Sequence, residues 1–252
     1  SSTRKEFFGG GGGVSVELKK QNVLITGSAN RIGKEIAIHL SKLGLNIAIH
    51  YNSSKKEAEK TLAEIKKQNV EVDIFHSNLS NEENCKNLII EAEKKLGKIS
   101  ILINNASTFR QNTLENTSSK ILQEDLFINL VAPFILAKSI FDIEKKGKVI
   151  NISDWRTARP NRFSYGVSKA SIYGLTKSLA VSMAPNYQVN EIALGAILPP
   201  ADDPNRELKK INLGLIERIA RIEEVTGCVE MLIKNDFITG ERIFLDGGRH
   251  VF

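Results

Sequence analysis

The sequence predicts an α/β protein with a doubly wound parallel sheet of about seven strands and helices on both faces. Short apolar runs alternate with longer segments of helical periodicity along 252 residues, which is the pattern of right-handed βαβ units. A glycine-containing turn over residues 26–33 follows the first apolar run and opens a helical segment. This turn and the strand count disfavour a TIM barrel, the main rival fold.

The expected strands are short runs rich in Ile, Val and Leu, bounded by Gly or polar residues. Their continuous apolar character is typical of strands that are buried on both faces of a parallel sheet. Strands are predicted at residues 22–27, 45–50, 70–75, 99–103, 148–152, 189–193 and 242–245.

The expected helices carry apolar residues at intervals of three and four, which line one face of a helix. Gly44 is placed to cap the first of them, and Pro133 lies inside the fourth. A polar loop with a short helix is expected over 195–214. Helices are predicted at residues 31–43, 54–68, 81–96, 119–144, 163–184 and 223–234. Their inward positions in the first three are Ile32, Ile36, Leu40, Leu43, Ala58, Leu62, Ile65, Cys85, Leu88, Ile89 and Ala92.

Composition excludes several classes of protein. The net charge of +6 comes from lysines scattered among glutamates, which indicates solvated helix faces and no nucleic-acid surface. The two cysteines, Cys85 and Cys228, have no ligand cluster nearby, so neither a disulfide scaffold nor a metal site is expected. A reducing, cytoplasmic compartment fits best. No apolar run is long enough to cross a membrane.

The first twenty residues differ from the rest. They contain a run of five glycines and no periodicity, which is typical of a flexible leader. Residues 21–252 show no internal boundary and no repeat beyond the alternation of strand and helix, so they are expected to form a single domain.

Tyr165 and Lys169 are four residues apart in a predicted helix, so they share one face. An ammonium group beside a phenol favours the phenolate and lowers its pKa, which suits acid–base catalysis near neutral pH. Asp154 is expected just past the end of the preceding strand, where open α/β sheets bind their ligands. A Tyr-x-x-x-Lys pair alone is common by chance on helix surfaces.

The first turn supplies a candidate phosphate site. Its glycines, Gly27 and Gly33, open a helix N-terminus whose free N–H groups and dipole favour a pyrophosphate. Asn30, Arg31 and Ile32 complete the turn. Arg31 stands where a dinucleotide fingerprint has its middle glycine, which costs backbone freedom but adds a cation for a pyrophosphate or for an anionic or planar substrate. A tight connection without a ligand is the alternative.

The end of the second strand distinguishes the two nicotinamide dinucleotides. It reads His50-Tyr51-Asn52-Ser53 and is followed by two lysines. A site for NAD carries a carboxylate here for the ribose hydroxyls, and none is present. These residues therefore favour NADP(H), although the two lysines are equally consistent with the solvated start of a helix.

The end of the fourth strand brings small residues and one aromatic to the same edge of the sheet. Asn105, Ala106 and Ser107 allow the backbone to approach a ligand, and Phe109 follows in a polar stretch. Phe109 either stacks on a flat heterocycle or packs into the core. In the long helix, Asn129 precedes Pro133, which opens the turn. Asn129 then either holds a water near Lys169 or is structural.

Taken together, these motifs resemble the short-chain dehydrogenase/reductase family, and the resemblance covers about residues 20–252. The family has a Rossmann-like fold, and the resemblance implies that Tyr165 donates a proton, Lys169 binds the nicotinamide ribose and Asn129 supports a relay water. It also implies a homotetramer. The matching motifs are Thr26-Gly27…Gly33, Asn104-Asn105-Ala106, Asn129, Tyr165-x-x-x-Lys169, the strand end at Gly195 and Leu245-Asp246-Gly247-Gly248. The resemblance further places Asn78, Leu79, Gly195 and Ile197 at the cofactor.

Four positions are similar to the pteridine reductases and dihydromonapterin reductases of this family. They are Arg31 in the first turn, Ser107, Phe109 and Asp154. By this resemblance Phe109 stacks on the pterin, Arg31 and Ser107 flank it, and Asp154 acts with the tyrosine on the substrate.

The spacing before Tyr165 departs from this pattern. Asp154 precedes it by eleven residues and Ser153 by twelve, about two fewer than in those reductases. Ser153 therefore remains an alternative partner, in the role of the family's usual serine. Leu194 and Asn78 replace a common Pro and Asp.

These residues predict an NADPH-dependent reductase that transfers hydride to a pterin-like small molecule, of the dihydropterin, dihydromonapterin or dihydrofolate class. A 3-oxoacyl-thioester or general carbonyl reductase that uses Ser153 is the alternative within the family. A dinucleotide-binding sensor without turnover is the alternative of another class.

Overall fold

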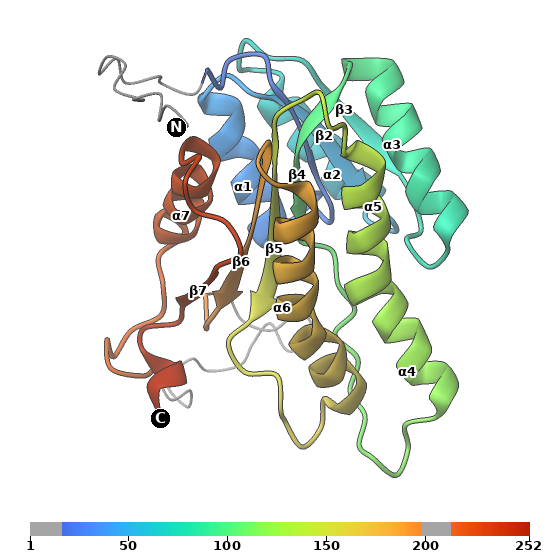
Figure 1. The fold of residues 1–252 in the computed structure, drawn as a ribbon, viewed down its shortest axis with the longest axis vertical. Helices are drawn as coiled ribbons and strands as arrows, with labels where there is room; N and C mark the ends of the chain where they lie inside the picture. The colour runs from blue at the N-terminus through green and yellow to red at the C-terminus, as the bar shows by residue number, and fades with distance from the viewer. Residues whose placement is uncertain (1–16, 198–212) are drawn as a thin grey trace, which may run out of the picture.

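Seven parallel strands form one sheet in the order β3-β2-β1-β4-β5-β6-β7 (Figure 1). The computed structural model describes residues 17–197 and 213–252. The predicted doubly wound Rossmann-like fold is thus confirmed. The strands are β1 (Asn22–Ile25), β2 (Asn46–Tyr51), β3 (Val72–His76), β4 (Ile99–Asn104), β5 (Gly147–Asp154), β6 (Tyr187–Leu194) and β7 (Arg242–Leu245).

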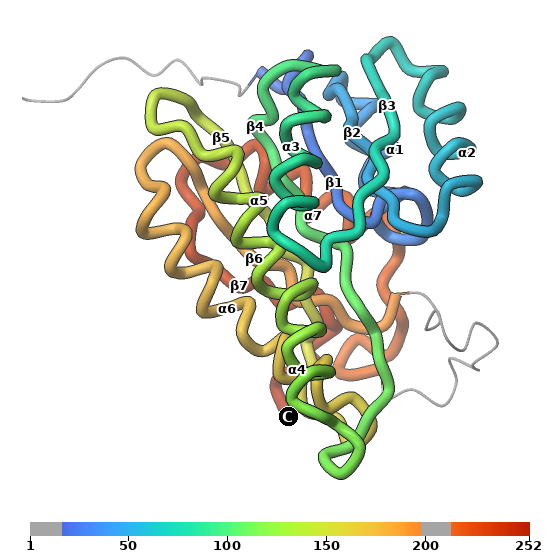
Figure 2. Tube along the Cα trace, turned by 90° about the vertical axis from the view of Figure 1, so that its right-hand side faces the viewer, coloured from blue at the N-terminus to red at the C-terminus, as the bar shows by residue number. Residues whose placement is uncertain are grey.

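Helices cover both faces of the sheet (Figures 1 and 2). Apolar side chains of α1 (Arg31–Lys42), α2 (Lys55–Ile65) and α7 (Ile222–Lys234) share one core cluster on one face. The other face packs against α3 (Glu82–Leu96), α5 (Ala132–Ile140) and α6 (Phe163–Met183). The described helices also include three shorter elements: α4 (Ser119–Leu126), the π-helical turn η1 (Phe127–Val131) and the terminal 3₁₀ turn η3 (Arg249–Val251).

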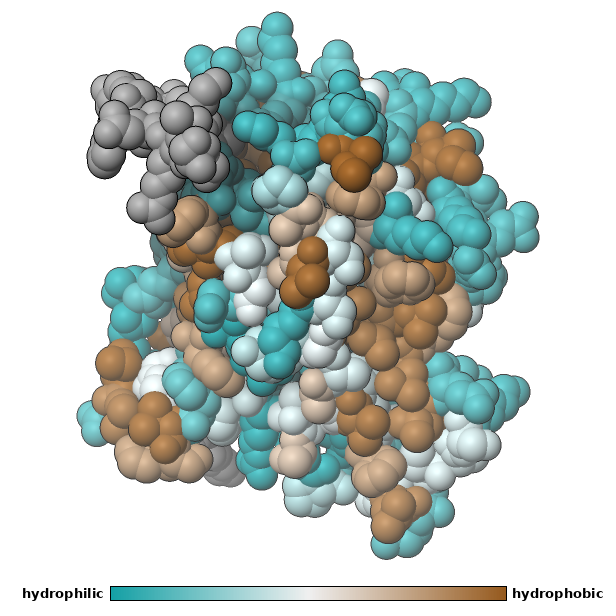
Figure 3. Space-filling view, in the orientation of Figure 1, coloured by the Kyte–Doolittle hydropathy of each residue, from teal (hydrophilic) through white to brown (hydrophobic). Residues whose placement is uncertain are grey.

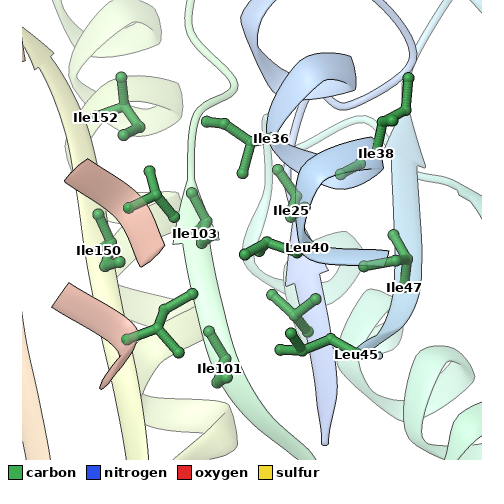
Figure 4. Packing of buried hydrophobic residues seen from close by; sticks show 14 of the residues in the cluster. Ile25, Ile36, Ile38, Leu40, Leu45, Ile47, Ile101, Ile103, Ile150 and Ile152 are labelled. Carbon is green, nitrogen blue, oxygen red and sulfur yellow. The ribbon is translucent and has the colours of Figure 1, made fainter. Parts of the chain in front are cut away.

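The cluster beneath α1 and α7 is almost entirely aliphatic (Figure 4). Successive strand residues point to opposite faces, so Ile101 and Ile103 of β4 and Ile150 and Ile152 of β5 project to this side. Burial of such side chains contributes about 25 cal/mol per Å² and fixes the strand register. The register in turn aligns the carboxyl ends of β1, β4 and β5 at one edge.

The long helical segment differs from prediction. It consists of α4, a π-helical turn η1 and α5, and it ends at Ile140. Pro133 has no N–H to donate to the carbonyl four residues earlier, that of Asn129, and the π turn lies there. Single π turns inside helices are frequent at functional sites.

Strand β5 is longer than predicted at both ends. Its carboxyl end pairs with β6 through Asp154↔Leu194, so Asp154 is the last residue of the strand and does not lie beyond it. At the other end of the chain, Leu18 is buried in the core, so the domain includes residues before 21. The remainder of the predicted leader and most of the predicted 195–214 loop lie outside the described residues.

Within the described ranges, no helix is long and apolar enough to cross a membrane. The same ranges contain no group of three or more His, Cys, Asp or Glu side chains that could hold a metal ion. Cys85 is buried and Cys228 is partly buried, and neither forms a disulfide.

Candidate active site

A cavity of about 560 Å³ opens at the carboxyl ends of β1, β4 and β5. The strand order reverses between β1 and β4, and open α/β sheets bind ligands at this switch point. The volume is in the range of small-molecule sites. Sixteen of the predicted site residues line it: Gly27, Asn30, Arg31, Ile32, His50, Tyr51, Asn52, Ser53, Asn105, Ala106, Ser107, Phe109, Asp154, Tyr165, Lys169 and Gly195.

The first turn is compact and locally strained. Gly27 has φ +62°, and a Cβ at Gly33 would lie 2.3 Å from the carbonyl oxygen of Gly27, so Gly33 admits no side chain. Arg31 has φ +55°, the left-handed conformation that costs a non-glycine residue about 1–2 kcal/mol. Strain of this kind collects at ligand-binding sites, and it explains why this position usually holds glycine.

His50 fastens this turn to the second strand. The N–H of Gly27 donates to its Nδ1 at 2.9 Å, so Nε2 carries the proton and donates to the Ser77 carbonyl at 2.8 Å. Burial lowers the pKa of His50 to about 4, which keeps the ring neutral. The ring borders the cavity, but both nitrogens are bonded within the protein.

Thr26 ties the first turn to the end of β4. Its Oγ1 accepts hydrogen bonds from the backbone N–H groups of Asn105 and Ala106, both at 2.9 Å. The Asn105 amide donates back to the carbonyls of Thr26 and Gly27 at 3.2 and 3.1 Å. The two segments that form the cavity floor are therefore held together by four hydrogen bonds.

Tyr165 meets Asp154 at the wall of the cavity. The phenol donates to Oδ2 of Asp154 at 3.1 Å, and Oδ1 accepts from Arg159 Nη2 at 2.9 Å and from the N–H of Arg156 at 3.0 Å. Lys169 is buried one helical turn away and donates to the Ile152 carbonyl at 3.4 Å.

The expectation that Lys169 lowers the pKa of Tyr165 is wrong for this structure. Burial and the neighbouring Asp154 raise the pKa of Tyr165, although Arg159 and Arg162 oppose them. Burial also lowers the pKa of Lys169 to about 8, against the charges of Asp154 and Glu191. Desolvation and the Asp154 carboxylate outweigh the attraction of the two arginines, so the phenol is protonated and serves as a hydrogen-bond donor.

Ser153 does not contact Tyr165. Its Oγ donates to Oε1 of the buried Glu191 on β6. Ser153 and Asp154 both line the cavity with Tyr165, but the Ser153 hydroxyl is directed to Glu191 and not to the phenol. Between the two candidate partners, Asp154 is the residue bonded to Tyr165.

Phe109 lies against the tyrosine. The two rings meet edge to face, with centroids 4.9 Å apart and planes at 80°. The guanidinium of Arg162 lies 3.5 Å from the Phe109 centroid and donates to the carbonyl of Phe109. The ring therefore borders the cavity and is not tucked into the core.

Comparison with known proteins identifies the family. The family model described as enoyl-(acyl carrier protein) reductase matches residues 27–250. The chain belongs to the short-chain dehydrogenase/reductase family. It is 30% identical over 242 residues to the 3-oxoacyl-[acyl-carrier-protein] reductase FabG of Staphylococcus aureus (strain N315), covering 92% of this chain and 98% of that protein.

Two solved structures are similar at comparable identity. FolM alternative dihydrofolate reductase 1 from Brucella canis, complexed with NADP, is 32% identical with a TM-score of 0.84, covering 94% of this chain and 96% of that one. The Brucella suis protein of the same name, also in complex with NADP, is 32% identical with a TM-score of 0.82, covering 92% and 96%. This short-chain dehydrogenase/reductase is therefore an oxidoreductase.

Five predicted site residues do not line the main cavity of this oxidoreductase. Gly33 lies beneath the first turn, and Leu79 and Ile197 are buried in the core. Asn78 borders a separate cavity of about 360 Å³ beside β3 and α3. Asn129 is buried in η1, where Oδ1 accepts from the N–H of Thr108 at 3.0 Å and Nδ2 donates to Ser168 Oγ at 2.8 Å.

Sequence reasoning missed the arginines and the buried acid around the site. Arg156, Arg159 and Arg162 recur every third residue after Asp154, and this charge spacing was a usable clue. Arg249 stacks on Trp155 at 4.4 Å, and nothing local in the sequence predicts that contact. Glu191 carried no clue either, because nothing in the sequence shows that the acid is buried.

Proposed function

We propose that this oxidoreductase uses NADPH to reduce a pterin-like substrate of the dihydropterin, dihydromonapterin or dihydrofolate class. The observation that carries the proposal is the hydrogen bond between Tyr165 and Asp154, with Phe109 against the same phenol. A carboxylate beside the proton donor suits a ring nitrogen, which must gain a proton as the adjacent carbon gains hydride. The similarity to the FolM proteins supports the same substrate class.

The residues present fit the cofactor, NADP(H). Gly33 packs so closely against the Gly27 carbonyl that no side chain fits there. No side chain at Gly33 therefore covers the backbone of the first turn, and its N–H groups can face a pyrophosphate. Asn52 and Ser53 at the end of β2 present no carboxylate to repel a 2′-phosphate. When bound, the cofactor supplies the hydride.

In the proposed mechanism, Tyr165 transfers its hydroxyl proton to the substrate nitrogen. Asp154 accepts from the Tyr165 hydroxyl and orients it, while Arg159 and the Arg156 backbone hold the other carboxylate oxygen. Lys169 then returns a proton to the phenolate, because its buried ammonium has a pKa of about 8 and gives up the proton near neutral pH. Phe109 forms part of the wall that a flat ring would pack against, and Arg162 lies on the Phe109 ring.

The second candidate, a 3-oxoacyl-thioester reductase, is supported by the similarity to FabG. It would use Ser153 beside Tyr165. In this structure Ser153 donates to Glu191 instead, so this reaction would require its side chain to turn.

Steady-state NADPH oxidation separates the two candidates. Dihydropterins, dihydrofolate and a 3-oxoacyl thioester would each be offered to the parent protein, to Asp154→Asn and to Ser153→Ala. We expect turnover of a dihydropterin or dihydrofolate, a loss of about 10²-fold or more in Asp154→Asn, and retained turnover in Ser153→Ala. Turnover of the thioester alone, abolished by Ser153→Ala, would overturn the proposal.

We also propose that the chain assembles as a homotetramer. Apolar side chains gather on the face formed by α4, α5 and α6 (Figure 3), and Phe134, Val167 and Val181 are among those exposed. Light scattering coupled to gel filtration should give four chain masses; a single chain mass would contradict it.

A further inference from the structure

Glu191 is a buried acid that the proposed mechanism does not use. It lies in β6, has no exposed surface and is flanked along the strand by Asn190 and Ile192. One carboxylate oxygen accepts from Ser153, and the other lies 3.2 Å from Nε of Arg242 on β7. Burying a carboxylate costs several kcal/mol unless partners compensate.

Arg242 compensates this charge incompletely. Oε2 of Glu191 and Nε of Arg242 are both buried, yet their geometry does not make a hydrogen bond. The guanidinium instead lies over the ring of Tyr173 at 4.4 Å from its centroid. An ion pair without a directed hydrogen bond is a weak stabiliser of the fold, so a structural role alone does not explain the acid.

Two hydrogen bonds to adjacent residues of β5 link the acid to Lys169. Ser153, whose hydroxyl Glu191 binds, directly follows Ile152, whose carbonyl accepts from the Lys169 ammonium. Tyr173, under Arg242, is one helical turn beyond Lys169 on α6. The negative charge of Glu191 therefore attracts the buried ammonium of Lys169. The protein interior between them screens charges poorly.

The charged and polar groups around this ammonium come from five elements. Asp154 of β5 and Glu191 of β6 favour the charged lysine, and burial opposes them. Tyr165 of α6 has its ring centroid 5.9 Å from Nζ and is neutral while protonated. Arg242 of β7 lies behind Glu191 and offsets part of its charge. From η1, the neutral Asn129 reaches α6 through Ser168.

We propose that Glu191 is a positioning residue that holds Lys169 in its charged, proton-donating form. This inference rests on the proposed role of Lys169 in proton return, and it adds a buried group that does not line the cavity. It predicts opposite effects for the two members of the ion pair. Loss of the carboxylate removes an attraction to the ammonium, whereas loss of Arg242 removes a repulsion and leaves the carboxylate uncompensated.

The test is a direct titration of Lys169 in the cofactor-free protein, by NMR of lysine labelled with ¹³C at Cε. The Lys169→Arg variant identifies the resonance. We expect Glu191→Gln to lower the titration midpoint of Lys169 by about one pH unit, and Arg242→Gln to raise it by up to about one pH unit. Glu191→Asp, which keeps the charge, should restore most of the parent midpoint.

Glu241→Gln is the matched control, since Glu241 is an exposed acid beside Arg242. The titration midpoint of Lys169 in this variant should equal that in the parent protein. An unchanged midpoint in Glu191→Gln would overturn the inference. If Glu191→Gln does not fold, a midpoint in Arg242→Gln that fails to rise overturns it equally. This titration needs no substrate, so its result is independent of the substrate assay. If the Lys169 midpoints shift as predicted but dihydropterins are not turned over, only the proposed reaction is refuted.

With an accepted substrate, the alkaline limb of the kcat profile should move with the Lys169 midpoint: to lower pH in Glu191→Gln and to higher pH in Arg242→Gln. A residue that merely supported the fold would lower kcat in both variants without moving the limb in opposite directions.

Discussion

Over residues 150–153, the two faces of β5 are made of different chemistry although they share one backbone. Ile150 and Ile152 point into the aliphatic cluster beneath α1 and α7 (Figure 4). Asn151 and Ser153 point toward α6, where Asn151 donates to Thr176 at 3.0 Å and accepts from Asn104 at 2.9 Å. One face stabilises the sheet by burial, and the other holds polar groups in fixed positions beneath the site.

This difference teaches how the sheet separates stability from chemistry. Non-directional apolar packing tolerates small shifts of side chains, whereas each buried polar group costs about 1–3 kcal/mol if its partner is removed. The polar face is therefore the more specific of the two, and the aliphatic face the more stabilising. Substitutions on the two faces should therefore differ in what they change, either activity or stability.

The largest effect is expected at Tyr165. Tyr165→Phe removes the proposed proton donor but keeps the ring against Phe109, so kcat should fall by about 10²–10⁴-fold with little change in stability. Tyr173→Phe, on the same helix, is the matched control and should keep most of its turnover. Equal activity in Tyr165→Phe and the parent would show that the phenol donates no proton.

Adjacent residues of β5 provide the next comparison. Ile150→Ala should lower the free energy of unfolding by about 2–5 kcal/mol, because it leaves a cavity in the aliphatic cluster. Asn151→Ala should lower it by about 1–3 kcal/mol, because Thr176 and Asn104 lose a buried partner. Urea denaturation measures both. If Asn151→Ala costs more than Ile150→Ala, the assignment of stability to the aliphatic face is wrong.

His50 should make stability depend on pH. Its pKa in the folded protein is about 4, below the ordinary 6.5, so the unfolded chain binds its proton first as the pH falls. Its contribution is complete above about pH 6.5 and is lost as the pH falls toward 4, a change of about 3 kcal/mol. His50→Gln should remove that part of the slope in urea denaturation at several pH values.

The exposed His76 is the control for this titration. His76→Gln should keep most of the slope between pH 6.5 and 4, because His76 is only the smallest of the influences on the pKa of His50. If His50→Gln and the parent show the same slope, then His50 is not held neutral in the folded protein.

The smallest effect concerns the backbone of the first turn. Arg31→Gly and Arg31→Ala both delete the side chain, but only glycine adopts φ +55° without strain. The glycine variant should be more stable than the alanine variant by about 1 kcal/mol, opposite to their order inside a helix. Thermal melting of the two variants measures the difference, and the reverse order would show that the turn relaxes.

The local pattern of the sequence was sufficient for the fold and for the parts of the site that follow strand ends. Apolar periodicity placed every strand of the described sheet, and small residues at residues 105–107 marked the cavity floor. The predicted end of β5, residue 152, came too early because Ser153 and Asp154 are polar. In the structure both residues still pair with β6.

Interactions between distant residues could not be predicted from the sequence. The pKa of Tyr165 depends on how much water the fold removes from the phenol, and a spacing of four residues does not report that. Glu191 binds Ser153 across 38 positions of sequence. No periodicity or motif connects residues that far apart, and only the pairing of β5 with β6 brings them together.

The hydroxyl of Thr26 has a thermodynamic consequence for ligand binding. A threonine oxygen has two lone pairs, and the N–H groups of Asn105 and Ala106 occupy both. The floor of the cavity is thus ordered when the chain folds, and a dinucleotide arriving there meets a preorganised surface. The entropy of arranging these loops is lost during folding and does not reduce the affinity for the cofactor.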